Sequence, residues 1–199
     1  KYPVVTLTGP RQSGKSTMLR NVLPQFKYVS LEALDHREFA ANDPLGFLKN
    51  NQPPVIIDEA QHVPQLFSYI QEIVDKENNV GMYVLSGSHN FLLMQSVTQS
   101  LAGRAALLRL LPLSHSEMAD TGCLPHTLDE ELCRGAFPRL YHRDIAPADF
   151  YPDYIATYLE RDVRLLRNIG DLNKFVTFIR MCAGRIGQLL NMSSLASDC

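Results

Sequence analysis

A glycine-rich loop near the N-terminus constrains the fold of this chain more than any other stretch. Residues 9–16 are Gly-Pro-Arg-Gln-Ser-Gly-Lys-Ser, which fits the phosphate-loop pattern G-x-x-x-x-G-K-[ST]. The β-branched run at residues 4–8 predicts a buried strand before the loop, and residues 16–23 predict a helix after it. In this order, the N–H groups at the helix N-terminus can surround a pyrophosphate. The flanking segments therefore favour a phosphate site over an accidental glycine-rich turn.

The pattern also predicts which residues contact a bound nucleotide. Lys15 would reach the β- and γ-phosphates, and Ser16 would place its hydroxyl on Mg²⁺. Arg11 is open to two interpretations, contact with the nucleotide or exposure to solvent. The residues that we expect to bind nucleotide are Gly9, Pro10, Arg11, Gln12, Ser13, Gly14, Lys15, Ser16 and Thr17.

Composition limits the class of protein. The 199 residues are 45% apolar and 20% charged, which is typical of a globular protein with one good core and a smaller appended unit. The net charge of −2 gives no overall basic field for nucleic acid. Four cysteines without C-x-x-C or zinc-like spacing predict reduced thiols and a cytoplasmic protein. No apolar run reaches the roughly 18 residues of a membrane span, so we expect no membrane partner.

Strand and helix patterns alternate through the first half of the chain. Strands are predicted at 4–8, 26–31, 55–59, 81–88 and 105–111, with helices at 16–23, 34–39, 44–49, 66–76 and 91–101. This alternation predicts an α/β fold, a doubly wound parallel five-stranded P-loop NTPase core. After Pro112 the alternation stops, and helices predicted at 130–134, 151–168 and 171–182 indicate an all-α C-terminal region. We place the boundary between 1–114 and 115–199, and both chain ends suggest a part of a longer protein.

Two acidic residues end the third predicted strand. Asp58 would meet the Mg²⁺ held by Ser16, since both would lie at the carboxyl edge of the sheet. Glu59 could polarise a water for attack on the γ-phosphate, which favours hydrolysis over transfer by a small-molecule kinase. The alternative is an ordinary acidic strand end.

Other candidates have weaker support. Ser86 and Ser88 follow the fourth strand, where either could orient the attacking water or only form a turn, and His89 and Asn90 are further candidates. Arg104 could act as an arginine finger in the site of a neighbouring subunit of a homo-oligomer, or lie in solvent. The six histidines form no H-E-x-x-H motif and no i, i+4 pair, so we expect structural or solvated roles for all of them.

With these residues, the chain resembles the AAA-type ATPases of bacteria and archaea whose C-terminal half is a domain of unknown function. The similar stretches are residues 9–17, 55–61, 85–88, 100–104, 111–114, 135–138, 158–163 and 187–191. The resemblance implies an additional-strand core over 1–114, and a helical lid with the start of a truncated winged-helix-like domain over 115–199. It also implies roles for six positions: phosphate binding by Lys15, Mg²⁺ binding by Ser16 and Asp58, water activation by Glu59, a sensor at Ser86 or Ser88, and a finger at Arg104.

The function that we expect is Mg²⁺-dependent ATP hydrolysis coupled to conformational change in the C-terminal region. The preference for ATP comes from the resemblance, and the absence of a guanine-reading Asn-Lys-x-Asp stretch points the same way. The main alternative is a nucleotide-regulated switch with little turnover that binds DNA or protein through the C-terminal region. A small-molecule kinase is a weaker third hypothesis.

Overall fold

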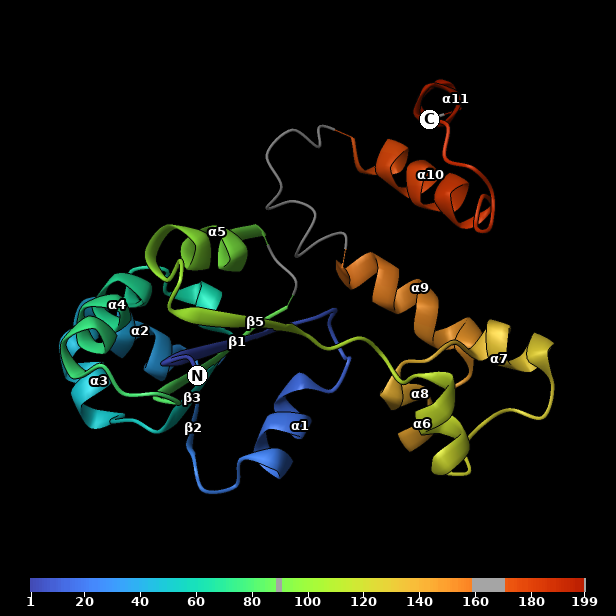
Figure 1. Cartoon of the computed structure of the whole chain (residues 1–199). Coiled ribbons are helices and arrows are strands. Elements are labelled where there is room, and N and C mark those ends of the chain that lie inside the picture. The colour runs from blue at the N-terminus through green and yellow to red at the C-terminus, as the bar shows by residue number, and fades with distance from the viewer. Residues whose placement is uncertain (89–90, 159–170, 199) are drawn as a thin grey trace. The chain divides into compact units, whose positions relative to one another are not determined.

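The computed structural model describes residues 1–88, 91–158 and 171–198 (Figure 1). The chain divides into two compact units, Lys1–Pro147 and Ala148–Cys199. The first unit contains the sheet, and the regular elements described in the second unit are all helices.

The first unit is built on a five-stranded parallel sheet. Its strands, in the spatial order β2-β3-β4-β1-β5, are β2 (Lys27–Ser30), β3 (Val55–Asp58), β4 (Tyr83–Ser86), β1 (Val4–Thr8) and β5 (Ala105–Arg109). All four pairings are parallel, which confirms the predicted fold class. β4 lies between β1, which enters the glycine-rich loop, and β3, which ends in Asp58. This is the additional strand that the resemblance implied.

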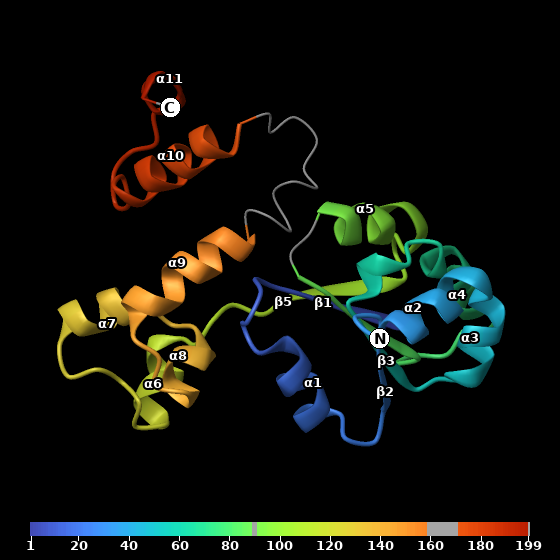
Figure 2. The same ribbon diagram turned by 180° about the vertical axis from the view of Figure 1, so that it is seen from behind.

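Helices cover both faces of the sheet, and they do so unequally (Figures 1 and 2). Leu19 of α1 (Lys15–Val22) packs with Ile56 and Val84 on one face. Val55 and Ile57 point to the other face because side chains alternate along a strand. That face is covered by α2 (Leu34–Asn42), α3 (Pro44–Asn50), α4 (Leu66–Glu77) and α5 (Phe91–Ser100).

Local sequence signals account for where several helices start. Asp43 accepts a 2.9 Å hydrogen bond from the Gly46 N–H, and Pro44 occupies the first helical position of α3, as predicted. Ser114 and Glu117 form a capping box at α6 (His115–Asp120). Neither α6 nor α8 (Pro138–His142) was predicted, although the Ser-x-x-Glu signal for α6 is visible in the sequence. The predicted helix at 130–134 is part of α7 (Leu128–Arg134).

The second unit is all-α over its described residues. It contains α10 (Leu172–Ala183), capped by Asp171, and α11 (Met192–Ser197), capped by Asn191. α9 (Pro147–Tyr158) begins at the boundary between the units. The predicted continuation of this helix to residue 168 lies outside the described residues, as does most of the stretch 158–163. Among the helices that the structure describes, none is long and apolar enough to cross a membrane.

We predict that Leu85→Ala lowers the free energy of unfolding by about 2–5 kcal/mol, because the side chain is fully buried in a central strand and its loss leaves a cavity. Leu107→Ala is the matched control, since Leu107 lies on the edge strand β5 with 53% of its surface exposed, and it should cost less than about 1 kcal/mol. Urea denaturation of both variants measures the difference. Equal losses would contradict the strand order.

Candidate nucleotide-binding site

Two glycines set the shape of the predicted phosphate loop. A Cβ atom on Gly9 would lie 2.1 Å from the Leu110 carbonyl oxygen, so only glycine allows this approach to the chain leaving β5. Gly14 has φ 92°, in the left-handed region, and it precedes the first residue of α1. The loop therefore turns directly into the N-terminus of a helix.

The loop surrounds the ammonium group of Lys15. Lys15 is buried, and its Nζ donates hydrogen bonds to the carbonyl oxygens of Gly9 at 3.0 Å and Pro10 at 2.8 Å. In the described part of the chain, no side chain caps the N-terminus of α1. The N–H groups there and the Lys15 ammonium form a positive environment that suits an anion such as phosphate.

The remaining loop residues differ in exposure. Ser13 is buried, Arg11 is half-buried, and Gln12 and Thr17 are exposed. Gln12 also has a positive φ of 61°, so a non-glycine residue helps to form the turn. The structure thus brings the predicted binding residues together in one loop, with unequal access to solvent.

Asp58 accepts hydrogen bonds from four donors, one on α1 and three at the sheet edge. Its Oδ2 accepts from the Ser16 hydroxyl at 2.6 Å and from the Tyr28 hydroxyl. Its Oδ1 accepts from the Ser86 hydroxyl at 2.5 Å and from the Glu59 N–H at 3.1 Å. The predicted metal ligands Ser16 and Asp58 are therefore in direct contact, although they are 42 residues apart in the sequence.

These contacts keep Asp58 ionised. Burial raises the pKa of Asp58, but hydrogen bonds from Ser16, Ser86 and Tyr28 outweigh it, and the net pKa lies below the ordinary value of 3.8. An ionised carboxylate beside a hydroxyl is an all-oxygen donor set of the kind that Mg²⁺ prefers. The residues present therefore fit the implied magnesium ion.

Tyr28 is a member of the site that the sequence analysis missed. Burial first, and then the hydrogen bond to Asp58, raise the pKa of the Tyr28 hydroxyl, which stays a donor at neutral pH. The Arg20 guanidinium lies 3.9 Å from the centre of the Tyr28 ring and holds it by a cation–π contact. Only the pairing of β2 with β3 reveals this role, because a tyrosine in a strand is otherwise an ordinary core residue.

The two candidate serines occupy different places. Ser86 is fully buried and bonded to Asp58, whereas the buried Ser88 hydroxyl has no hydrogen-bond partner among the described residues. The structure thus links Ser86 directly to the predicted metal ligand. His89 and Asn90 lie outside the described residues.

Glu59 directly follows Asp58, at the same edge of the sheet. Its φ of 55° is left-handed, which turns the chain abruptly into the 3₁₀ helix η1 (Ala60–His62). The Gln61 side-chain amide donates to Glu59 Oε2 and restrains the carboxylate. A strained backbone angle at a strand end that carries a polar side chain is typical of a functional position.

Arg104 does not lie near the phosphate loop. It precedes β5, at the amino edge of the sheet, and it forms a bidentate pair with Asp75 of α4, with Nε–Oδ1 at 2.5 Å and Nη2–Oδ2 at 2.8 Å. The pairing lowers the pKa of the Asp75 carboxyl. Since the loop follows the carboxyl end of the parallel neighbour β1, the sheet separates Arg104 from the loop of its own chain.

A residue outside the sheet also approaches the loop. The ring of Pro138, at the start of α8, lies 3.9 Å from the position that a Cβ on Gly14 would take. Pro138 ends the stretch 135–138, one of those that resemble the AAA-type ATPases. Pro138 and Gly14 are more than a hundred residues apart in the sequence, so no local sequence pattern predicts that they lie side by side.

Comparison with known proteins agrees with this geometry. Residues 1–119 match the family described as AAA domain. The chain belongs to the AAA domain family. Residues 125–199 match a domain of unknown function, so the order of domains in the resemblance is confirmed, while the winged-helix-like character of the second one stays a prediction.

Similar proteins extend the comparison. Uncharacterized proteins of Mycobacterium tuberculosis and Mycobacterium bovis are each 32% identical to the chain over 204 aligned residues. The match covers 98% of this chain but 44% of each relative, so the chain spans less than half of their length. The structure of a Walker-type ATPase of Pyrococcus abyssi covers 100% of the chain with a TM-score of 0.56 at 15% identity, and 84% of that protein is matched. This likeness concerns the fold, a P-loop NTPase core.

We predict that Asp58→Asn lowers the free energy of unfolding by about 1–3 kcal/mol at neutral pH, because it weakens several buried hydrogen bonds. A lowered carboxyl pKa stabilises the fold above the unfolded-state value near 3.8, and this contribution is lost as the pH falls through the folded-state pKa. The gap between wild type and variant should therefore start to narrow only as the pH falls below 3.8, and close once Asp58 is protonated in the folded state. Urea denaturation across a pH series measures it, and the exposed Asp75→Asn is the control with a much smaller effect. A gap that persists in acid would contradict the assignment.

Proposed function

We propose that this chain is the ATPase part of a larger protein and hydrolyses ATP with the help of Mg²⁺. The observation that supports this most strongly is the direct contact between Ser16 of the loop and Asp58 of β3, with Glu59 next in sequence. A phosphate-binding loop, an oxygen donor set for a metal and an adjacent carboxylate are the groups that nucleotide hydrolysis requires.

Each group would have a distinct task. The N–H groups at the start of α1 and the Lys15 ammonium would bind the β- and γ-phosphates, with Lys15 exchanging its loop carbonyls for phosphate oxygens. Ser16 and Asp58 would hold Mg²⁺, which neutralises phosphate charge when bound. Glu59 would orient a water and accept its proton.

Two further roles are proposed on different grounds. Ser86 is the better candidate for the sensor, because its bond to Asp58 couples β4 to the metal ligands; Ser88 is the alternative. Arg104 would serve as a finger only for a second copy of the chain, since it lies at the opposite edge of the sheet from its own loop. A homo-oligomer is therefore part of this proposal.

The larger protein would use hydrolysis through its C-terminal region. We propose a core over 1–114, and a helical lid with the start of a winged-helix-like domain over 115–199, whose movement follows the nucleotide state. The free cysteines Cys123, Cys133 and Cys182 support a cytoplasmic location.

The sharpest test separates binding from hydrolysis. Glu59→Gln should bind ATP as tightly as wild type but release phosphate about 10²- to 10⁴-fold more slowly, because the proton acceptor is lost. Lys15→Ala should weaken binding itself, since the enclosed cation is removed. Fluorescent-nucleotide titration and steady-state phosphate release measure the two effects.

Glu72→Gln is the control, because this exposed carboxylate on α4 forms its ion pair with Lys76 at the helix surface, away from the loop. It should leave both measurements unchanged. Undiminished phosphate release by Glu59→Gln would overturn the assigned mechanism, whereas tight binding without any turnover in wild type would favour the switch.

A mixing experiment tests the proposed finger. Arg104→Ala and Glu59→Gln should each be nearly inactive, but a mixture would contain sites that combine an intact Glu59 with an intact Arg104 from the neighbour. We expect the mixture to release phosphate faster than either variant alone. A mixture no faster than its components would argue against action between subunits.

A further inference from the structure

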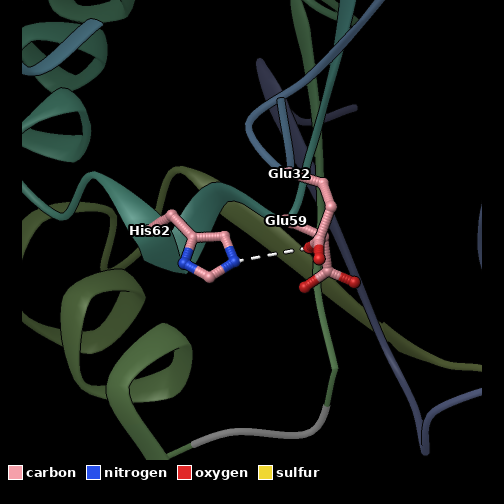
Figure 3. A group of neighbouring side chains, drawn as sticks. All are labelled: Glu32, Glu59 and His62. Carbon is pink, nitrogen blue, oxygen red and sulfur yellow. Dashed lines mark ion pairs between the residues drawn. The ribbon is translucent and has the colours of Figure 1, made fainter. Parts of the chain in front are cut away.

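A second group of ionisable side chains lies beside the Mg²⁺ ligands. Figure 3 shows Glu32, Glu59 and His62, and the atoms with which they could bind a metal, two carboxylate oxygens and an imidazole nitrogen, lie within 4.8 Å of one another. Among the residues that the structure describes, this is the only place where three such ligands come together. We propose that Glu32, Glu59 and His62 bind a divalent transition-metal ion such as Zn²⁺, at a site separate from the one for Mg²⁺.

The sheet register places the first two ligands side by side. β2 and β3 pair in parallel with Ser30 opposite Asp58, and the Leu31 N–H continues the pairing with a 2.9 Å bond to the Asp58 carbonyl. Glu32 and Glu59 therefore leave neighbouring strands at the same edge. Two carboxylates this close repel each other, so a cation between them is favoured.

The 3₁₀ turn adds the third ligand. His62 N–H donates to the Glu59 carbonyl at 3.1 Å, which closes the turn, and the ligand atoms of the two side chains lie within 4.8 Å of each other. The left-handed φ of Glu59 starts this turn, while Ala60 and Val63 fix it in the core. Spacing of i, i+3 in a 3₁₀ turn is the signal that a search for i, i+4 histidine pairs misses.

One distance fits a pair of metal ligands. His62 Nε2 and Glu32 Oε2 are 3.6 Å apart, an ion pair when the imidazole is protonated (Figure 3) and longer than the usual hydrogen-bond range of about 2.7–3.2 Å. Two ligands of a tetrahedral zinc ion, at about 2.0–2.2 Å from the metal, are separated by about 3.4 Å. The half-exposed Glu32 side chain has room to adjust, so the group can close on an ion with little movement.

The backbone supports of the site are already in place. The Arg37 guanidinium bonds to the carbonyl oxygens of Leu31 at 3.0 Å and Glu32 at 3.2 Å, which fixes the turn that carries the Glu32 carboxylate. Gln61 holds one carboxylate oxygen of Glu59, and the other can bind a cation at the same time. Such supports orient ligands before an ion arrives.

The ligand chemistry separates the two metal sites. Ser16 and Asp58 offer oxygen alone, which suits Mg²⁺, whereas the imidazole of His62 favours Zn²⁺ over Mg²⁺. Glu59 cannot bind such an ion and accept a proton from water together. The bound transition metal would therefore inhibit hydrolysis, a consequence that rests on the proposed function.

Metal titration tests the site without any nucleotide. We expect the metal-stripped chain to bind one equivalent of Co²⁺ or Zn²⁺, followed by visible absorption and calorimetry, and His62→Gln and Glu32→Gln to bind at least about 10-fold more weakly. His115→Gln is the matched control, because His115 pairs with Glu131 at 2.8 Å without a third ligand among the described residues, and it should bind like wild type. Circular dichroism verifies that each variant is folded. Unchanged affinity in His62→Gln, or no binding by wild type, would overturn the proposal.

Phosphate release tests the consequence. With Mg²⁺ and ATP in fixed excess, Zn²⁺ should inhibit wild type and His115→Gln at the same concentration, and His62→Gln only at about 10-fold more. Equal inhibition of all three would place the effect at the Mg²⁺ site and overturn the inhibitory role. A wild-type chain that binds Zn²⁺ but never releases phosphate would refute the proposed function while leaving the metal site supported.

Discussion

The candidate site depends on the hydrogen bonds that the carboxylate of Asp58 accepts. It accepts hydrogen bonds from α1 through Ser16, from β2 through Tyr28 and from β4 through Ser86. One buried anion thereby joins the glycine-rich loop to three neighbouring strands. Because an unpaired buried charge is costly, any arrangement that separates these elements loses several bonds together, and the sheet edge is held in one geometry.

The same edge brings two kinds of ligand close together. Asp58 faces the loop with oxygen donors, while the next residue, Glu59, turns away through a left-handed backbone angle toward Glu32 and His62. A single peptide step thus separates the group proposed to hold Mg²⁺ from the group proposed to activate water. A metal ion bound at Glu59 would inhibit hydrolysis without moving the phosphate loop, because the loop is hydrogen-bonded to Asp58 and not to Glu59.

Much of the fold could be predicted because its signals are local. The loop motif, the alternating strands and helices, and the Asp43-Pro44 start of α3 each depend on residues within a few positions of one another. The short helix α6 also starts at a local signal, the Ser114–Glu117 capping box, but with six residues it is too short to show a helical spacing of apolar residues. The short helix α8 has little beyond a proline at its start.

The sequence by itself determined the phosphate loop, the class of fold and the acidic pair at the end of β3, since motif, periodicity and strand ends are written in adjacent residues. Only the tertiary structure decided that Tyr28 and Ser86 bond to Asp58, that Glu32 and His62 gather around Glu59, and that Arg104 pairs with Asp75. The physical reason is strand order and register. Placing β4 between β1 and β3, and Ser30 opposite Asp58, sets which distant side chains meet, and these pairings depend on packing across the whole sheet.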